Sequence, residues 1–216
     1  MAALSAEHVR SALAGVRSRA DAAAARAARD PGAVEILVAV KYVTADDIDA
    51  LADAGVTLVG ENRAQDLLEK VTRAPGRLRW HFIGTVQSRK VRLIVPHVEL
   101  IHSVASESVL RELGRHAPPG FEILVEVNVS GEDGKAGIAP AQLDAFIARS
   151  PVTVAGLMTM PPLTSDPEGS RSYFAALAQL ARERGLERLS MGTSQDFEVA
   201  VEEGATIVRI GTIILF

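Results

Sequence analysis

Short runs rich in Val, Ile and Leu alternate with helical segments along almost the whole chain. Eight runs have the length and composition of β-strands, and we predict strands near 34–40, 56–60, 80–84, 98–103, 121–129, 152–158, 188–191 and 206–210. Seven helical segments lie between them, near 44–54, 63–73, 86–95, 106–115, 140–149, 168–184 and 195–203. This alternation favours a parallel sheet with helices outside, and eight units favour a closed barrel over an open sheet.

A further helix is predicted in front of the first strand. Residues 5–28 are rich in Ala and Arg, and apolar side chains recur at spacings of three and four, at Val9, Leu13, Val16 and Ala20. The Asp-Pro-Gly run that starts at Asp30 ends this helix. We therefore expect an α/β fold, a single (β/α)8 TIM barrel with an extra N-terminal helix, in which residues 1–216 form one domain.

Composition excludes several classes of protein. The chain is 48% hydrophobic and 23% charged with a net charge of -4, so it has no general attraction for nucleic acid or anionic membranes. It has no cysteine, which excludes disulfides and thiolate metal sites and fits a reducing cytoplasm. No run reaches the roughly 18 apolar residues of a membrane span, and the N-terminus lacks a signal-peptide pattern. We expect a cytoplasmic protein that contacts neither nucleic acid nor membrane.

Polar residues at the carboxyl ends of barrel strands are the candidates for chemistry. Lys41 follows the first strand, and alternation puts Leu37, Ala39 and Lys41 on one face. If that face is the barrel interior, partial desolvation lowers the pKa of the amine, and a neutral amine can attack an aldehyde. The residues alone also fit a lysine that only extends into solvent after a buried strand.

Two glycine-containing turns follow the seventh and eighth strands. Barrels often bind phosphate at this position, where backbone N–H groups and helix N-termini point at the ligand. The residues are Met191, Gly192, Thr193 and Ser194 in the first turn and Gly211 and Thr212 in the second. Ser194 also fits a helix N-cap, which is compatible with phosphate binding.

Three other polar residues have competing interpretations. Arg209 lies inside an apolar strand, where it needs either a carboxylate such as Glu126 or a ligand. Asn62, three residues before Gln65, resembles an ordinary helix cap, and Thr44 to Asp47 resemble a capping box. His81 follows Trp80, which is more typical of a core histidine than of a catalytic one.

Several segments together resemble the pyridoxal 5′-phosphate (PLP) homeostasis proteins, the YggS/PROSC family. They extend in the right order over most of the chain: LVAVKYV (37–43), VGENRAQDL (59–67), WHFIGTVQSRK (80–90), IHSV (101–104), VNVSGEDGKAGI (127–138), GLMTMPP (156–162) and LSMGTSQDFEVAVEEGATIVRIGT (189–212). The resemblance implies a barrel like the N-terminal domain of alanine racemase, with PLP as cofactor.

The resemblance also implies roles for individual residues. Lys41 would hold PLP as a Schiff base, Asn62 would lie beside it, and Arg209 would face its pyridine nitrogen. The phosphate would be bound by Ser194, Gly211 and Thr212, with Met191 and Gly192 shaping the turn and His81 nearby. A permanently cationic arginine disfavours a protonated pyridine, so the cofactor is a weak electron sink.

We therefore expect a non-catalytic PLP carrier or regulator in vitamin B6 and amino-acid homeostasis. Its partners would be PLP and PLP-dependent apoenzymes, and it would be a monomer. The alternative is a PLP-dependent amino-acid racemase, which needs a second acid/base on the opposite face of the cofactor, whereas alternation points Tyr42 away from the barrel interior. A Schiff-base aldolase is a third possibility, with Glu61 or Glu126 as its carboxylate.

Overall fold

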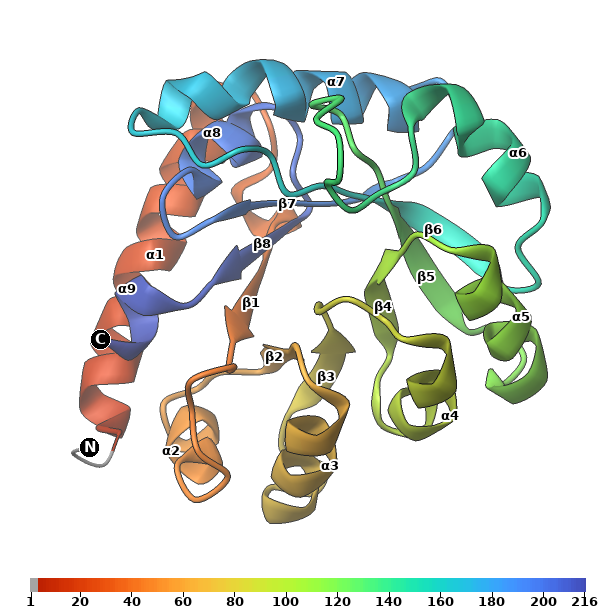
Figure 1. Cartoon of the computed structure of the whole chain (residues 1–216). Coiled ribbons are helices and arrows are strands. Elements are labelled where there is room, and N and C mark those ends of the chain that lie inside the picture. The colour runs from red at the N-terminus through yellow and green to blue at the C-terminus, as the bar shows by residue number, and fades with distance from the viewer. Residues whose placement is uncertain (1–3) are drawn as a thin grey trace.

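A computed structural model describes residues 4–216 and contains eight parallel strands that close on themselves. Figure 1 shows the strands around a common centre with helices outside them. The strands are β1 (Glu35–Ala39), β2 (Leu58–Glu61), β3 (Arg79–Phe82), β4 (Leu100–Val104), β5 (Glu122–Glu126), β6 (Thr153–Met158), β7 (Arg188–Thr193) and β8 (Ile207–Ile210). The predicted (β/α)8 barrel with its eight strands is confirmed.

The helices follow the strands as predicted, although several are shorter than their patterns suggest. They are α1 (Ala6–Arg26), α2 (Ile48–Asp53), α3 (Ala64–Arg73), α4 (Val91–Ile94), α5 (Glu107–His116), α6 (Leu143–Ala148), α7 (Arg171–Arg182), α8 (Phe197–Glu202) and α9 (Thr212–Leu215). Short 3-10 turns precede or follow some of them. Among the described residues, no helix is both long and apolar enough to cross a membrane.

Side-chain alternation divides the hydrophobic residues between two cores. A large core lies between the strands and the helices, and a small one fills the barrel interior. The interior core consists of Leu37, Leu58, Leu100, Leu124, Met158 and Ile207. Successive residues of a strand point to opposite faces, so six of the strands contribute to both cores, whereas β3 and β7 add no residue to the interior apolar core. The interior is therefore a packed core, and a ligand can enter only at an end of the barrel.

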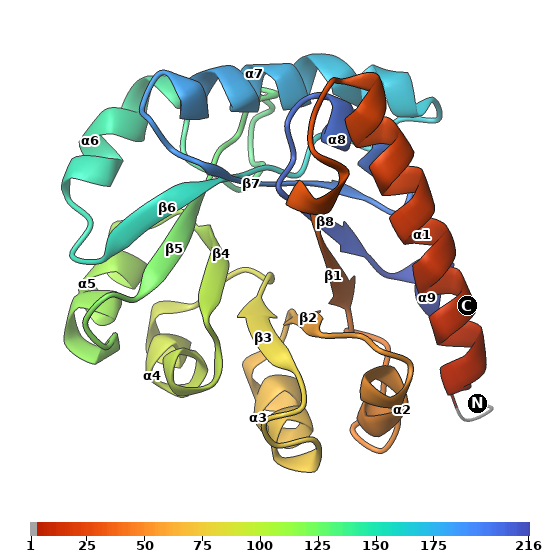
Figure 2. The ribbon, with the colours of Figure 1, turned by 180° about the vertical axis from the view of Figure 1, so that it is seen from behind.

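The extra helix α1 packs along the outside of the barrel, beside α8 and α9 (Figure 2). It begins at a Ser5 N-cap, and its buried stripe consists of Val9, Val16, Ala20, Ala23 and Ala24. Leu13 of the predicted stripe is partly buried against the same core. This packing places α1 beside α9, the last helix of the chain, as both ribbon views show.

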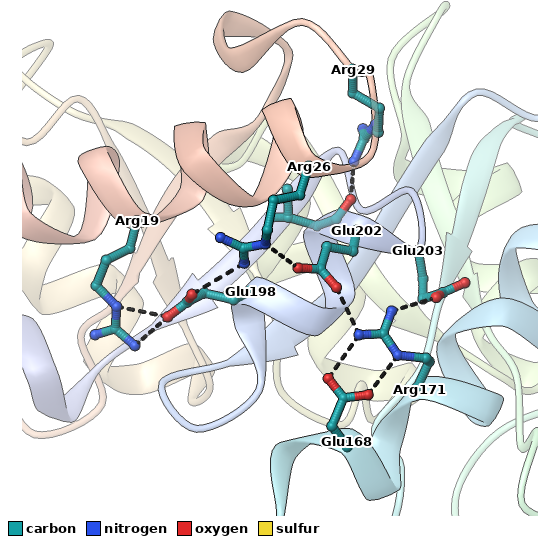
Figure 3. A network of polar contacts seen from close by, with 9 residues as sticks. Arg19, Arg26, Arg29, Glu168, Arg171, Glu198, Glu202 and Glu203 are labelled. Carbon is teal, nitrogen blue, oxygen red and sulfur yellow. Dashed lines mark hydrogen bonds and ion pairs between the residues drawn. The ribbon is translucent and has the colours of Figure 1, made fainter.

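Ion pairs connect α1, α8 and the start of α7 (Figure 3). Arg26 pairs with Glu198 and Glu202 of α8, and Arg171 pairs with Glu202 at 2.7 Å. Arg29 contributes differently, because it donates to the backbone carbonyls of Val201 and Ala205 at the end of α8. The Val201 carbonyl also accepts from the backbone N–H of Gly204 at 3.1 Å, so Arg29 adds a charged donor at the carboxyl end of α8.

The capping box predicted at Thr44 is wrong. Helix α2 begins only at Ile48, and its N-cap residue, Asp47, makes no capping bond with its side chain. The Thr44 hydroxyl instead donates to the Asp47 carboxylate at 2.7 Å, and this bond closes a turn. A side chain of this type can satisfy either a turn or a helix start, and the sequence pattern is the same for both.

We expect Arg29→Met to lower the free energy of unfolding by about 1–3 kcal/mol, because two partly buried carbonyls lose their charged donor. Arg19→Met is the matched control, since Arg19 pairs with Glu198 on an exposed surface, where such pairs contribute about 0–1 kcal/mol. Chemical denaturation of both variants measures the difference. Equal losses would contradict the capping role of Arg29.

Candidate functional site

A cavity of about 450 Å³ opens at the carboxyl ends of the strands. It brings together six of the nine residues predicted from the sequence: Lys41, Asn62, Ser194, Arg209, Gly211 and Thr212. The remaining three, His81, Met191 and Gly192, do not line it. Active sites of barrels form at this end of the strands, so the position agrees with a functional site.

Lys41 stands at the mouth of the cavity. Strand β1 ends at Ala39, and the alternation predicted from the sequence holds beyond its end. Leu37 lies in the barrel interior, Ala39 and Lys41 line the cavity, and Val40 is buried in the outer core. The Lys41 side chain is exposed, so its amine is accessible from solvent.

The prediction that Tyr42 points away from the barrel interior is wrong. Tyr42 lines the same cavity, and its ring centre lies 4.6 Å from Nζ of Lys41. Strand geometry stops at Ala39, so residues 41 and 42 belong to a turn in which consecutive side chains can share one side. The ring covers the lysine amine, in the geometry of a cation–π contact.

A buried ion pair beneath this turn holds its backbone in place. Lys70 of α3 pairs with Glu61 at the end of β2, and Lys70 also donates to the carbonyl of Val40 at 2.8 Å. The Glu61 carboxylate accepts from the backbone N–H of Asn62 at 2.5 Å and of Arg63 at 3.2 Å. The pair thus connects Val40, the residue before Lys41, with Asn62. Because the Glu61 carboxylate is bound to Lys70, it is not free to act as the acid of an aldolase.

Asn62 is not the cap of the following helix. Helix α3 begins at Ala64 with Arg63 as its N-cap residue, so the prediction from Gln65 is wrong. The Asn62 side chain instead lines the cavity, and its Oδ1 atom is buried without a hydrogen-bond partner within residues 4–216. An unsatisfied buried amide oxygen is unusual and indicates a missing partner, such as a ligand.

The turns after β7 and β8 also line the cavity. They contribute Ser194, Gly211 and Thr212. The Ser194 hydroxyl accepts from the backbone N–H of Gly211 at 3.1 Å, which connects the two turns. The N-cap of α8 is Asp196, so the cap predicted at Ser194 is wrong. Thr212 begins the four-residue helix α9, whose first backbone N–H groups have no partner within the helix.

Met191 and Gly192 support this turn from outside the cavity. Met191 is buried in the outer core. Gly192 has φ +88°, and a Cβ atom there would lie 2.5 Å from the Cβ of Ala200 in α8. Only glycine allows β7 and α8 to pack this closely, which agrees with the predicted role in shaping the turn.

Arg209 is buried without an ion pair among the described residues, so of the two alternatives for this residue the salt bridge with Glu126 does not form. Its guanidinium donates to Ser190 Oγ at 2.5 Å, to the Thr159 carbonyl at 2.9 Å and to Met160 Sδ at 2.9 Å. Burial lowers the pKa of Arg209 to about 10, so it stays cationic at neutral pH. The charge is held by neutral partners and remains available to a ligand in the cavity.

Glu126 lines the cavity from the end of β5. Burial raises the pKa of its carboxyl group, and the positive charge of Arg209 acts against this shift. Of Glu61 and Glu126, the two carboxylates considered for an aldolase, Glu126 is the one that lines the cavity.

His81 is a buried histidine of the barrel interior, as its position after Trp80 suggested. Its Nδ1 lies 3.0 Å from Nε2 of His102, and Nδ1 of His102 lies 2.8 Å from Ser190 Oγ. Burial and the charges of Arg188 and Arg79 lower the pKa of His81 to about 3. Burial and the neighbouring His81 lower the pKa of His102 well below its ordinary value.

Sequence reasoning missed Ser190, His102 and Lys70. Each is a single polar residue at an apolar position: Ser190 and His102 within strands, and Lys70 three residues after Leu67 on the buried face of α3. A polar residue at a core position indicates a buried partner. The partners themselves lie on other elements, so the sequence pattern could not name them.

The fold and the cavity define a barrel of the alanine racemase N-terminal-domain class, whose model matches residues 13–216. The pyridoxal phosphate homeostasis proteins of Aquifex aeolicus and Pseudomonas aeruginosa are each 39% identical to the chain. The matches cover 92% and 93% of this chain and 93% and 91% of those proteins. The chain belongs to the family of pyridoxal phosphate homeostasis proteins.

Solved structures agree with this assignment. PipY of Synechococcus elongatus, solved with PLP bound, is 31% identical with a TM-score of 0.79, covering 96% of this chain and 100% of PipY. A protein from Bifidobacterium adolescentis is 31% identical with a TM-score of 0.88, covering 97% and 95%. The lysine/ornithine decarboxylase of Vibrio vulnificus, at 14% identity and a TM-score of 0.71, shares the fold alone and is covered over 62% of its length.

Acidification should destabilise the protein through its two buried imidazoles. The unfolded chain binds protons to them near pH 6.5, whereas the folded pKa of His81 is about 3, so stability falls as pH drops below about 6.5. By pH 5 the expected loss from His81 is about 2 kcal/mol, and His102 adds a loss in the same direction. Chemical denaturation at pH 7, 6 and 5 measures it.

Two variants separate this effect from other groups. Glu126→Gln removes the carboxyl group with a raised pKa, which acts in the opposite direction and stabilises the fold at low pH. Ser170→Ala, which changes a buried residue that does not titrate in this range, should leave the pH dependence unchanged. A stability that stays constant from pH 7 to pH 5 in the Glu126→Gln protein would rule out the neutral buried imidazoles.

Gly192→Ala should lower the free energy of unfolding by about 2–4 kcal/mol, because backbone strain at positive φ adds to the clash with Ala200. Gly55→Ala is the matched control: its φ is +90°, but nothing lies within 4 Å of the added Cβ. Gly55→Ala should lower the free energy of unfolding only by the cost of backbone strain at positive φ, about 1–2 kcal/mol. Thermal or chemical denaturation compares them, and equal losses would show that the β7–α8 packing tolerates a side chain.

Proposed function

We propose that this protein binds PLP as a Schiff base on Lys41 and serves in intracellular PLP and amino-acid homeostasis without catalysing a reaction of its own. The observation that carries the proposal is the meeting of Lys41 and an unpaired, buried Arg209 in one cavity of about 450 Å³. The PLP-bound structure of the related PipY supports it independently.

The unsatisfied groups of the cavity fit the functional groups of PLP. Asn62 offers a buried amide oxygen that has no hydrogen-bond partner within residues 4–216, and it lines the same cavity as Lys41. Ser194, Gly211 and Thr212 offer a hydroxyl pair and the first backbone N–H groups of α9, which suit a phosphate. Arg209 offers a cation that can donate to the unprotonated pyridine nitrogen.

PLP supplies an aldehyde that condenses with amines and a ring that withdraws electrons from the condensed group. The ring withdraws electrons best when its nitrogen is protonated, and the cationic Arg209 disfavours that proton. Arg209 has no carboxylate partner within ion-pair distance in the described chain that could offset its charge. A cofactor held this way suits storage and release better than carbanion chemistry.

Tyr42 gives the racemase alternative a specific residue to test, because it lines the cavity. A two-base racemisation needs acid/base groups on opposite faces of the cofactor. Tyr42 lies against the amine of Lys41 itself, so it is on the same side as the lysine. The other tyrosine, Tyr173, is on α7 and does not line the cavity. This arrangement favours the carrier over the racemase.

The proposal includes the protein's partners and organisation. The chain would act as a monomer, with residues 1–216 as one PLP-binding domain in the cytoplasm, and would deliver PLP to apoenzymes that depend on it. The exposure of Lys41 at the cavity mouth supports delivery, because the amine that holds the cofactor can be reached by an incoming nucleophile.

The spectrum of the purified protein tests PLP binding. We expect a visible absorbance band, fixation of the cofactor to Lys41 by borohydride and loss of the band in Lys41→Ala, with the circular dichroism unchanged. Lys90→Ala, a replacement outside the cavity, is the control and should keep the band. A protein that stays colourless with added PLP, or label on Lys70, Lys90 or Lys135 instead, would refute the proposal.

The non-catalytic part of the proposal needs its own assay. The PLP-loaded protein is incubated with single amino-acid enantiomers, and the product is analysed by chiral chromatography. We expect no turnover above that of free PLP. Turnover that depends on Lys41 and is lost in Tyr42→Phe would establish the racemase instead.

A further inference from the structure

Four polar side chains form an unbroken chain of hydrogen bonds through the apolar interior of the barrel. Arg209 donates to Ser190 Oγ at 2.5 Å, Ser190 Oγ lies 2.8 Å from Nδ1 of His102, and Nε2 of His102 lies 3.0 Å from Nδ1 of His81. These residues come from β8, β7, β4 and β3, and all are buried. The series begins at the cavity and leads away from it.

The far end of the series lies at the amino end of the barrel. Nε2 of His81 is buried without a hydrogen-bond partner among the described residues. The nearest acidic atom is Oε2 of Glu99, at 4.0 Å, just before β4. Glu99 belongs to a surface group of ion pairs in which Arg79 contacts both Glu99 and Glu35. The series therefore leads from the cavity through the barrel interior toward the ion pairs around Glu99.

The chemistry of Arg209 fixes the direction of the first hydrogen bond and favours one direction for those that follow. A guanidinium can only donate, so Ser190 Oγ accepts from Arg209, and the buried hydroxyl is fully satisfied when it also donates its own proton. Its other partner is Nδ1 of His102, which therefore accepts. His102 then carries its proton on Nε2 and donates it to Nδ1 of His81. The proton of His81 is left on Nε2, toward the negative Glu99.

We propose that Ser190, His102 and His81 form a positioning chain that holds Arg209 at the cofactor and leaves its positive charge unpaired. For the contact between Arg209 and the cofactor, this inference rests on the proposed PLP binding. A carboxylate partner would also hold the guanidinium, but it would offset the field of the cation in the cavity. A series of neutral acceptors provides position without this cancellation.

The electrostatics of the interior agree with a neutral series. Burial and nearby cations hold the pKa of His81 to about 3, so its ring is uncharged at neutral pH. His102 is flanked by His81 and faces the charge of Arg209, which lowers its pKa in addition to burial. Both rings can therefore act as acceptors on the side of the arginine and as donors on the other.

The first experiment needs neither PLP nor a variant. Nitrogen-15 NMR of the labelled wild-type protein at pH 7 reports the protonation of each imidazole nitrogen. We expect His81 and His102 to be neutral and fixed with the proton on Nε2. A proton on Nδ1 of His102, a charged ring or an averaged mixture of tautomers would overturn the chain, whether or not the protein binds PLP.

The second experiment measures the effect on the cofactor. Ser190→Ala should weaken PLP binding about tenfold, shift the absorbance band and release the fixed tautomer of His102. His102→Gln, a break one link further from the cavity, should act in the same direction and more weakly. Ser170→Ala is the control, because Ser170 is equally buried but lies at the start of α7, outside the chain.

The outcomes separate the two proposals. A wild-type protein that does not bind PLP contradicts the proposed function, and the NMR result still decides the hydrogen-bond directions. Folded Ser190→Ala and His102→Gln proteins that keep both the PLP affinity and the band of the wild type would overturn the positioning role. A change of the band shared by Ser170→Ala would do the same, because it would reflect a general loss of packing.

Discussion

The pairing of β1 with β8 is the interaction on which the site depends. The two strands come from opposite ends of the chain, and their register places Leu37 beside Arg209 and Val38 beside Ile210. This closure packs Gly211 against Ala39, which precedes Lys41 by two residues. A Cβ atom added to Gly211 would lie 3.7 Å from the Cβ of Ala39. Lys41 and the turn at Gly211 therefore meet only because the barrel is closed.

The protein handles its two buried cations in opposite ways. Lys70 forms an ion pair with Glu61. The two side chains also bind backbone groups next to the site: Lys70 donates to the Val40 carbonyl, and Glu61 accepts from the N–H of Asn62. Arg209 has only neutral partners, at the cavity. A buried charge is costly unless it is paired, so a cation left unpaired at a cavity points to a ligand, whereas a paired one points to structure. This contrast separates Arg209, the proposed ligand-binding cation, from Lys70, which supports the backbone.

Much of the fold and part of the site could be predicted from the sequence. The eight strands were placed correctly because β-branched runs and their alternation are local properties of the chain. The same alternation correctly put Ala39 and Lys41 at one cavity. It failed for Tyr42, one residue further, because the strand had already ended. The caps predicted at Thr44, Asn62 and Ser194 failed because these side chains bond to turns or face the cavity instead.

The sequence by itself determined the barrel, its extra helix and the residue types at the ends of its strands, and its motifs indicated the family. Only the tertiary structure decided the partners of the buried polar groups. Arg209 binds Ser190 and forms no ion pair with Glu126. Glu61 pairs with Lys70, and His102 contacts Ser190, which is 88 residues away in the chain. The physical reason is the range of the interactions. Strand and helix patterns follow from neighbouring residues, whereas hydrogen bonds across the barrel depend on how distant strands are brought into register.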